Sequence, residues 1–260
     1  MKYFGGCDVG STYTKCVIID ENGKIVAHTT IRSKINAEIS ARDALEQTIA
    51  QVEGLKDIAD LAYLVGTGYG RNKVPQAQEN ISEISCHAMG VHVTNPDVKA
   101  IIDIGGQDVK GIAIDSDGTV KTFAMNDKCA AGTGRFFEAM ANAFECTLDE
   151  FSQLSLTAKN VIPITAQCTV FAESEVISCI GEGKPRADIA AGVVDSVASK
   201  VATLCSRQAL LPDIYLTGGL CHSPYFISRL SDKLGRTVRA LPDGHFAGAL
   251  GASLLAERMK

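Results

Sequence analysis

Two copies of one pattern decide the fold: DVGSTYTKCVIIDENG, residues 8–23, and DIGGQDVKGIAIDSDG, residues 103–118. They align without a gap, so that Asp8 matches Asp103, Gly10 matches Gly105 and Lys15 matches Lys110. Each copy predicts a strand, a tight glycine turn, a second strand and a D-x-x-G hairpin turn. The chain is therefore expected to contain two homologous halves, each opening with an antiparallel meander.

Outside the repeat, strand and helix patterns alternate, which predicts an α/β protein. Further strands are expected at 24–31, 61–68, 100–106, 119–125 and 213–220, and helices at 36–54, 187–211 and 246–259. Asn95-Pro96 is the natural breakpoint before the second copy. We therefore expect a first domain at 1–96 and a second at 97–260, with a C-terminal helix, 246–258, able to pack back on the first.

Composition excludes several classes of protein. The 260 residues carry a net charge of −5 without a Lys/Arg block, which argues against nucleic-acid or anionic-membrane binding. No apolar run reaches the roughly 18 residues of a membrane span, and the first residues lead straight into a predicted strand rather than a signal peptide. Nine cysteines, an odd number without a disulfide spacing pattern, indicate a cytoplasmic protein in which most thiols are buried. Cys16 and Cys179, in apolar runs, fit that interpretation.

The paired glycine turns are suited to binding phosphate. Glycines allow close backbone approach, and successive N–H groups form a nest for an anion. The hydroxyls of Ser11, Thr12 and Thr14 and the charge of Lys15 add donors in the first copy. Asp8 and Asp103, at the ends of buried strands, are placed to hold Mg²⁺ through its water. A single glycine turn is usually only a hairpin, but two copies together with LTGGL, residues 216–220, favour a polyphosphate site.

Cys129, in NDKCAAGTGRFF (126–137), and Cys168, in CTVFAESEVIS (168–178), stand at or just before predicted helices. The N-terminus of a helix favours a thiolate, so the pair suggests iron–sulfur ligands. Spacing alone leaves simple packing open, because the two lie far apart without a C-x-x-C. A catalytic thiol needs a histidine partner, and Cys86-His87 are adjacent and do not face each other, so packing is expected for that pair.

The three segments DVGSTYTK, DIGGQDVK and LTGGL resemble the nucleotide-binding signature of the acetate kinase, sugar kinase, Hsc70 and actin superfamily. The resemblance implies duplicated ribonuclease-H-like domains with ATP and Mg²⁺ in the cleft between them. Neither G-x-x-x-x-G-K-[ST] nor G-x-G-x-x-G occurs, so P-loop and Rossmann folds are excluded.

The resemblance also implies roles for individual residues. Asp8, Asp103 and Gln107 are the expected catalytic residues, with Gln107 orienting the attacking water or contacting the γ-phosphate. For His245, a nucleotide contact and a solvated loop position both remain open. Glu173 and Glu175 are expected as first-turn helix carboxylates. The expected nucleotide contacts are Gly10, Ser11, Thr12, Tyr13, Thr14, Lys15, Gly105, Gly106, Gln107, Asp108, Gly218, Gly219 and His245.

Five motifs, IDIGGQDVK, MNDKCAAGTGRF, CTVFAESEVIS, ISEISCHAMG and VGTGYGR, together resemble a narrower family. This is the family of ATP-dependent iron–sulfur activators of 2-hydroxyacyl-CoA dehydratases, which includes the ATPase subunits of benzoyl-CoA reductase. The resemblance implies that Cys129 and Cys168 from each of two identical chains hold one [4Fe–4S] cluster, since four thiolates are needed and one chain supplies two.

The activity implied is ATP hydrolysis coupled to electron transfer under anaerobic conditions. Ferredoxin or flavodoxin would supply one electron, ATP–Mg²⁺ would change the domain angle and move the helices after Cys129 and Cys168, and the dehydratase would receive the electron. An activator does not contact the acyl group, so its sequence leaves the choice of 2-hydroxyacyl-CoA open. Two alternatives are a small-molecule kinase of the same superfamily and a non-redox, ATP-gated interaction module. Iron bound to the anaerobically purified protein would distinguish them.

Overall fold

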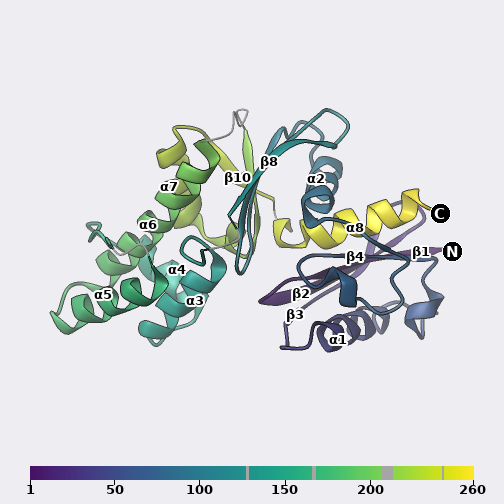
Figure 1. The fold of residues 1–260 in the computed structure, drawn as a ribbon, viewed down its shortest axis with the longest axis horizontal. Helices are drawn as coiled ribbons and strands as arrows, with labels where there is room; N and C mark the ends of the chain where they lie inside the picture. The colour runs from purple at the N-terminus through teal and green to yellow at the C-terminus, as the bar shows by residue number, and fades with distance from the viewer. Residues whose placement is uncertain (127–128, 166–167, 207–212, 242) are drawn as a thin grey trace. The chain divides into compact units, whose positions relative to one another are not determined.

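The computed structural model describes residues 1–126, 129–165, 168–206, 213–241 and 243–260 (Figure 1). The chain divides into two compact units. Unit 1 comprises Met1–Val98, Ile114–Thr122 and Asp243–Lys260, and unit 2 comprises Lys99–Ala113 and Phe123–Pro242. Asp127 and Lys128 of the NDKCAAGTGRFF motif, and 207–211 of the predicted helix 187–211, lie outside the described residues.

Unit 1 is built on a mixed sheet in the order β3-β2-β1-β4-β5. Its strands are β1 (Tyr3–Val9), β2 (Tyr13–Asp20), β3 (Ile25–Arg32), β4 (Tyr63–Thr67) and β5 (Glu79–Asn80). The first three are antiparallel, whereas β4 pairs parallel to β1 and β5 parallel to β4. Its helices are α1 (Ala37–Ile49), α2 (Glu83–Thr94) and α8 (Ala247–Arg258), with short 3-10 turns at Ile58–Asp60, Arg71–Lys73 and Gly244–Phe246.

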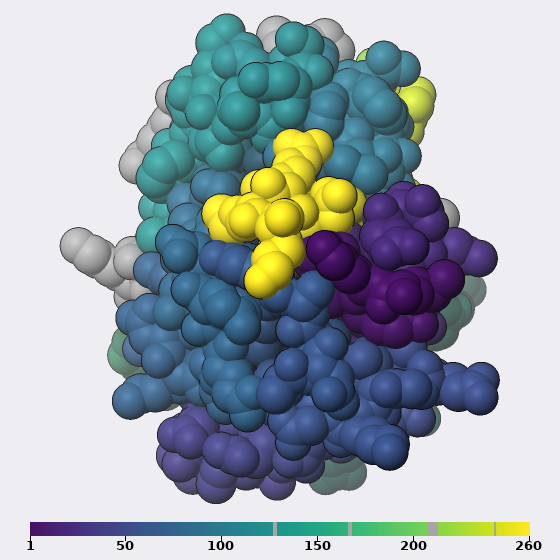
Figure 2. Space-filling view, turned by 90° about the vertical axis from the view of Figure 1, so that its right-hand side faces the viewer, coloured from purple at the N-terminus to yellow at the C-terminus, as the bar shows by residue number. Residues whose placement is uncertain are grey.

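Side chains of β2 alternate between the two faces of this sheet, because successive strand residues point to opposite sides. Cys16 and Ile18 join the core beneath α1, and Val17 and Ile19 join the core beneath α2 and α8. Figure 1 shows α1 on one side of the sheet and α8 on the other. Figure 2 shows the end of α8, in yellow, at the surface beside the N-terminal residues, in purple.

Unit 2 repeats this strand order. Its sheet runs β10-β9-β6-β7-β8, with β6 antiparallel to β7 and parallel to β9. The central strands of the two sheets, β1 and β6, carry Asp8 and Asp103. The strands are β6 (Ala100–Ile104), β7 (Val109–Ile114), β8 (Val120–Asn126), β9 (Ile214–Gly218) and β10 (Val238–Ala240); the end of β7 and the start of β8 fall within the segment Ile114–Thr122, which is counted in unit 1. The predicted α/β fold of two ribonuclease-H-like domains is therefore confirmed.

The helices of unit 2 surround one large apolar core. They are α3 (Gly134–Ala143), α4 (Leu148–Leu156), α5 (Thr169–Gly181), α6 (Arg186–Ser206) and α7 (Pro224–Leu234), with a 3-10 turn at Gly219–His222. Edge-to-face aromatic contacts link three of them: the ring of Phe137 lies 5.9 Å from Phe226 and 6.3 Å from Phe151. Such pairs stabilise a core beyond the area they bury.

Helix α6 is long and apolar enough to cross a membrane, and among the described residues it is the one helix that is. Within its apolar window 61% of the residues are buried inside the protein. Twelve of its residues, including Ile189, Val193 and Val197, are buried, and it packs against α4 and α7. These contacts are typical of the central helix of a folded domain.

Candidate functional site

The first glycine turn, Gly10–Thr12, joins β1 to β2 in unit 1. The Gly10 N–H donates to the Tyr13 carbonyl at 3.1 Å, and a Cβ at Gly10 would lie 2.7 Å from that oxygen, so only glycine fits. Ser33 braces the turn by donating from Oγ to the Gly10 carbonyl at 2.7 Å, and it shares a hydrogen bond of 2.9 Å with Thr14 Oγ1. Ser33 was not predicted, because it reaches the turn only through the pairing of β2 with β3.

Two groups of this turn are suited to a phosphate. Thr12 Oγ1 is buried and has no hydrogen-bond partner among the described residues. A buried hydroxyl without a partner costs about 1–3 kcal/mol, and a ligand oxygen would remove that cost. Within the same described residues Lys15 makes no ion pair, and its side chain is half-buried. Ser11 and Tyr13 are also half-buried here.

The second turn, Gly105–Asp108, joins β6 to β7 in unit 2 with the same geometry. The Gly105 N–H donates to the Asp108 carbonyl at 3.0 Å, as Gly10 does to Tyr13. A Cβ at Gly105 would lie 2.2 Å from Asp108 Oδ1. Gln107 is exposed and Gly106 half-buried at the tip of this turn. The repeat in the sequence thus corresponds to a repeated backbone turn.

Asp103 is fixed by two neighbours. Thr217 Oγ1 donates to its Oδ1 at 3.0 Å, and the Lys110 ammonium lies 3.3 Å from Oδ2. Lys110 also binds Asp108 Oδ1 at 2.7 Å. Lys110 and Asp103 are almost fully buried, and the Lys110 ammonium lies between the carboxylates of Asp103 and Asp108. A divalent cation prefers carboxylate and water oxygens, and these two aspartates offer carboxylates.

Asp8 is held differently, in a niche of glycine backbone. Gly68, at φ +84°, would place a Cβ 2.3 Å from Asp8 Oδ1, and Gly248 would place one 2.9 Å from Oδ2. The position that a Cβ at Gly248 would occupy also lies 2.9 Å from His87 Nε2. Sequence reasoning assigned His87 to packing, and the structure shows its ring edge at the Asp8 niche. The sequence signal that could have found His87 is a histidine within the apolar helix α2, together with the small residues at the start of α8.

The third glycine segment follows β9. Gly218 has φ +83°, and a Cβ there would lie 2.1 Å from the Ile104 carbonyl. Gly219 has open space where a Cβ would stand. His245 lies in the short turn before α8, half-buried, with its ring 4.1 Å from that of Phe246.

The nine cysteines separate by exposure as expected. Six are buried (Cys7, Cys16, Cys86, Cys179, Cys205 and Cys221), and Cys146 is half-buried. Burial raises the pKa of Cys86 and of Cys205 to about 12, so these thiols stay protonated and inert. Among the nine, the two exposed thiols are Cys129 and Cys168, the predicted cluster ligands.

The two exposed cysteines both lie close to Lys200 of α6. Burial lowers the pKa of Lys200, and the charges of Cys129 and Cys168 act against that shift, each from within electrostatic reach. The Lys200 Nζ lies 5.2 Å from the centre of the Phe136 ring, and its Cβ contacts the position above Gly132. Lys200 therefore connects α6 with the loop that carries Cys129.

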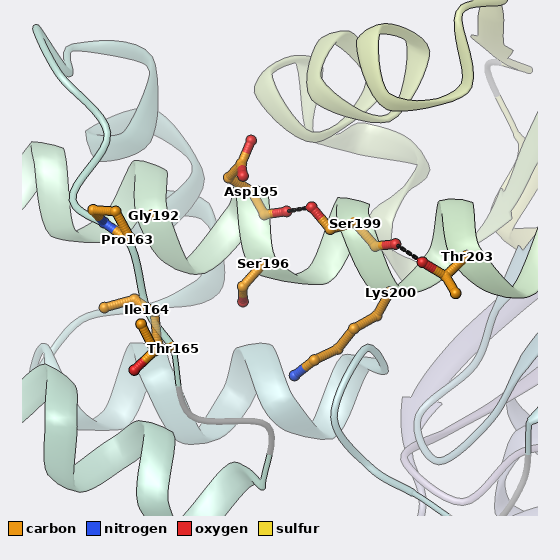
Figure 3. Close-up of a pocket in the computed structure, with 9 residues that line it drawn as sticks. All are labelled: Pro163, Ile164, Thr165, Gly192, Asp195, Ser196, Ser199, Lys200 and Thr203. Carbon is orange, nitrogen blue, oxygen red and sulfur yellow. Dashed lines mark hydrogen bonds between the residues drawn. The ribbon is translucent and has the colours of Figure 1, made fainter.

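Lys200 forms one wall of an open pocket of about 480 Å³ in unit 2. Figure 3 shows the pocket between α6 and Pro163, Ile164 and Thr165, the segment that leads to Cys168, with Lys200 extending from the helix. This segment passes close to α6, since a Cβ at Gly192 would lie 1.7 Å from the Ile162 carbonyl. The pocket and the two cysteines thus belong to one region of unit 2.

A direct hydrogen-bonded link joins the Cys129 loop to the second glycine turn. The Gly134 N–H donates to the Gly105 carbonyl and the Arg135 N–H to the Gly106 carbonyl, both at 2.9 Å. These amides are the first two of α3, which would otherwise lack partners. The turn and the start of α3 are consequently one bonded unit.

Two local predictions near the cysteines were wrong. Helix α3 begins at Gly134, five residues after Cys129, because the Thr133 N–H and hydroxyl both bind the Ala130 carbonyl and form a turn first. Only Cys168 stands directly at a helix start, as the N-cap of α5. Glu173 and Glu175 are not in the first turn of α5; Glu175 instead accepts from the backbone N–H and hydroxyl of Thr165.

Comparison with known proteins identifies the family. The sequence profile of the BadF/BadG/BcrA/BcrD ATPase family matches residues 6–256. The chain belongs to this ATPase family. Its predicted membership is confirmed, and the protein is accordingly an ATPase of the actin and Hsc70 fold.

Individual relatives within this family are similar over nearly their whole length. The chain is 44% identical over 254 residues to the activator of lactoyl-CoA dehydratase from Anaerotignum propionicum, covering 98% of this chain and 97% of the relative. It superimposes with a TM-score of 0.93 on component A of (R)-2-hydroxyglutaryl-CoA dehydratase from Acidaminococcus fermentans, at 40% identity, covering 100% and 99% of the two chains.

A second solved structure carries a nucleotide analogue. The activator of 2-hydroxyisocaproyl-CoA dehydratase from Clostridium difficile, with bound ADPNP, superimposes with a TM-score of 0.93 at 38% identity. The alignment covers 99% of this chain and 95% of that one. Nucleotide binding in this BadF/BadG/BcrA/BcrD ATPase agrees with the unpartnered Thr12 hydroxyl and the two glycine turns.

The cysteine residues of this ATPase also fit an iron–sulfur cluster. Iron–sulfur clusters are held by thiolates, and a site shared by two chains needs thiols at the surface. Cys129 and Cys168 are exposed and lie within electrostatic reach of one lysine, whose charge would compensate an anionic cluster. The donor set of one chain is therefore suited to half of a four-thiolate site.

Proposed function

We propose that this ATPase is the ATP-dependent activator of a 2-hydroxyacyl-CoA dehydratase. The observation that carries the proposal is the 44% identity with the activator of lactoyl-CoA dehydratase over 98% of the chain. The exposure of Cys129 and Cys168, in contrast to the six buried cysteines, supports it independently.

In the proposed site the two glycine turns bind the phosphates of ATP. The unpartnered Thr12 hydroxyl and the Lys15 ammonium supply a donor and a charge. Asp8 and Asp103 hold Mg²⁺ through its water, which suits a cation that dehydrates reluctantly. Gln107, exposed at the tip of its turn, orients the attacking water. Gly218 and Gly219 allow the adenosine to approach.

Cys129 and Cys168 from each of two copies are the proposed ligands of one [4Fe–4S] cluster. When bound, such a cluster takes up one electron from ferredoxin or flavodoxin and supplies it to the dehydratase. The exposed apolar side chains of α5 support a second copy as the covering partner: Val170 is 66% exposed, Phe171 70% and Ile177 54%. They follow Cys168 on the same helix, and apolar groups gathered at a surface mark interaction sites.

The link between α3 and the second glycine turn supports a route for coupling. Binding of phosphate by the N–H groups at the tip of the turn, those of Gly106 and Gln107, repositions the carbonyls of Gly105 and Gly106, which accept from the N–H groups of Gly134 and Arg135. The start of α3 then moves with the turn, five residues from Cys129. Nucleotide-dependent movement of a segment held by phosphate is a common switching device.

The test is anaerobic purification followed by metal analysis and activation of a dehydratase. We expect a brown protein with about four iron and four sulfide per dimer. ATP and a low-potential reductant should activate a lactoyl-, hydroxyglutaryl- or hydroxyisocaproyl-CoA dehydratase, and ADPNP should not sustain activation. A colourless, iron-free protein after anaerobic reconstitution would refute the proposal and favour a kinase or a non-redox module.

A further inference from the structure

His87 is a buried titratable residue for which the sequence predicts only packing and to which the proposed function assigns no role. It lies in α2 of unit 1, and only 3% of its surface is exposed. Its neighbour Cys86 is fully buried, and the carboxylate of Asp8 contributes, after burial, to raising the Cys86 pKa. This segment of α2 therefore lies beside the carboxylate of the first half-site.

Asp8 is confined by backbone on both of its carboxylate oxygens. A Cβ at Gly68 would lie 2.3 Å from Oδ1 and one at Gly248 2.9 Å from Oδ2, so any larger residue would displace the carboxylate. Asp8 itself is 7% exposed. A carboxylate removed from water in this way needs hydrogen-bond donors to remain charged.

The ring edge of His87 faces the same point as Asp8 Oδ2. A Cβ at Gly248 would meet both groups, at 2.9 Å from Oδ2 and 2.9 Å from Nε2. The absence of a side chain at Gly248 is what leaves room for the two groups at one place. Asp8, His87 and Gly248 come from β1, α2 and α8, so the arrangement requires three elements of unit 1 to be packed.

We propose that His87 is a positioning residue for Asp8, and that it orients the Asp8 carboxylate toward the hydrated magnesium of the bound nucleotide. This inference rests on the proposed function, which assigns Asp8 to that magnesium. A histidine beside a carboxylate that binds a metal fixes the direction of its oxygens, and removing such a partner typically weakens metal binding about 10- to 100-fold.

The experiment measures Mg²⁺ affinity rather than activity. The purified dimer is titrated with Mg²⁺ at a fixed concentration of a fluorescent ADP, and the nucleotide is also titrated in EDTA. His87→Leu should weaken Mg²⁺ about tenfold or more and leave nucleotide binding in EDTA unchanged. His87→Gln, whose amide nitrogen can stand where Nε2 stands, should restore most of the affinity.

His92→Leu is the matched control. His92 lies in the same helix, but its ring lies next to Gly118 instead: a Cβ at Gly118 would lie 2.8 Å from the His92 ring. It should bind Mg²⁺ as the unchanged protein does. Equal Mg²⁺ affinity in His87→Leu and the unchanged protein would overturn the inference, as would equal impairment of the Leu and Gln variants. Iron content and dehydratase activation of the unchanged protein test the proposed function separately.

Discussion

The two half-sites, one in each unit, share a backbone but hold their aspartates by different means. Asp8 and Asp103 both stand on the central strand of their sheet, and each is paired with a threonine on the neighbouring parallel strand, Thr67 or Thr217. Thr217 donates to Asp103, whereas Thr67 donates to the Ile81 carbonyl instead.

The matched lysines of the two copies also differ in their partners. Lys110 is buried between Asp103 and Asp108, and Lys15, its counterpart, is half-buried without an ion pair among the described residues. Asp8 lies in a glycine niche with His87 in place of a lysine. Duplication thus preserved the turns, and the side-chain partners diverged. Unit 2 holds its carboxylate with charge, and unit 1 leaves its lysine available to a ligand.

The largest expected effect is on bound iron and concerns the two exposed cysteines, both of which lie in unit 2. Cys129→Ser or Cys168→Ser should reduce bound iron and sulfide to near zero, because each change removes two of the four thiolates of the proposed cluster. ADP binding should persist, since the glycine turns remain. The measurement is iron and sulfide content beside ADP titration. Cys146→Ser, at a half-buried cysteine of unit 2, is the control and should keep its iron; unaltered iron in Cys129→Ser would disprove the ligand assignment.

The second prediction replaces each of the two matched lysines, Lys110 and Lys15, with methionine. Lys110→Met should lower the free energy of unfolding by about 3 kcal/mol, because it leaves Asp103 buried without its counter-charge. Lys15→Met should leave stability nearly unchanged and weaken ATP binding. Urea unfolding and ATP titration of both variants measure the difference. Similar loss of stability in both would show that the half-sites are alike after all.

The third prediction tests whether the backbone is shared. Gly218→Ala should destabilise the protein by about 2 kcal/mol, because φ is positive and a carbonyl lies in the way. Gly68→Ala, in the equivalent place of unit 1, should behave alike. Gly219→Ala, where space is open, serves as the control. The measurement is the unfolding midpoint of the three variants. A Gly68→Ala variant as stable as the unchanged protein would show that Gly68 and Gly218 are not equivalent.

The smallest effect concerns Lys200, a cation beside the cysteines of unit 2. Lys200→Met should keep the iron and lower the reduction potential of the dimer by at most about 60 mV, since removal of a positive charge disfavours the added electron. An anaerobic redox titration followed by absorbance measures the change. Lys184 is a lysine of unit 2 paired with Glu182 at the end of α5, and Lys184→Met should leave the reduction potential unchanged. Equal potentials in the two variants would show that the charge of Lys200 does not act on the proposed cluster.

Local patterns were enough to predict much of this molecule. The hairpins at Asp20 and Asp115 form as expected, with the N–H of each aspartate donating to the carbonyl four residues later. The repeat gave the duplicated sheets, and the apolar surroundings of Cys16 and Cys179 gave their burial. Such predictions succeed because strand alternation, turns and a repeated backbone depend on neighbours in sequence.

The errors and omissions lie where distant segments meet. The start of α3 was misplaced because the Thr133 turn and the carbonyls of Gly105 and Gly106 decide it. Glu175 was assigned to a helix dipole, but Thr165 binds it from a preceding segment. The position of His87 depends on α8, more than 150 residues further along the chain.

The sequence by itself determined the duplicated ATPase fold and its two glycine turns, because both are written in a local pattern and its repeat, and the resemblance to the activator family singled out Cys129 and Cys168 among nine cysteines as candidate ligands. Only the tertiary structure decided which neighbours hold each aspartate, that α3 is bonded to the second turn, and that Lys200 lies beside both exposed thiols. These contacts form when α2, α6 and α8 pack on their sheets, and packing is governed by shape and burial across the whole chain rather than by the order of residues along it.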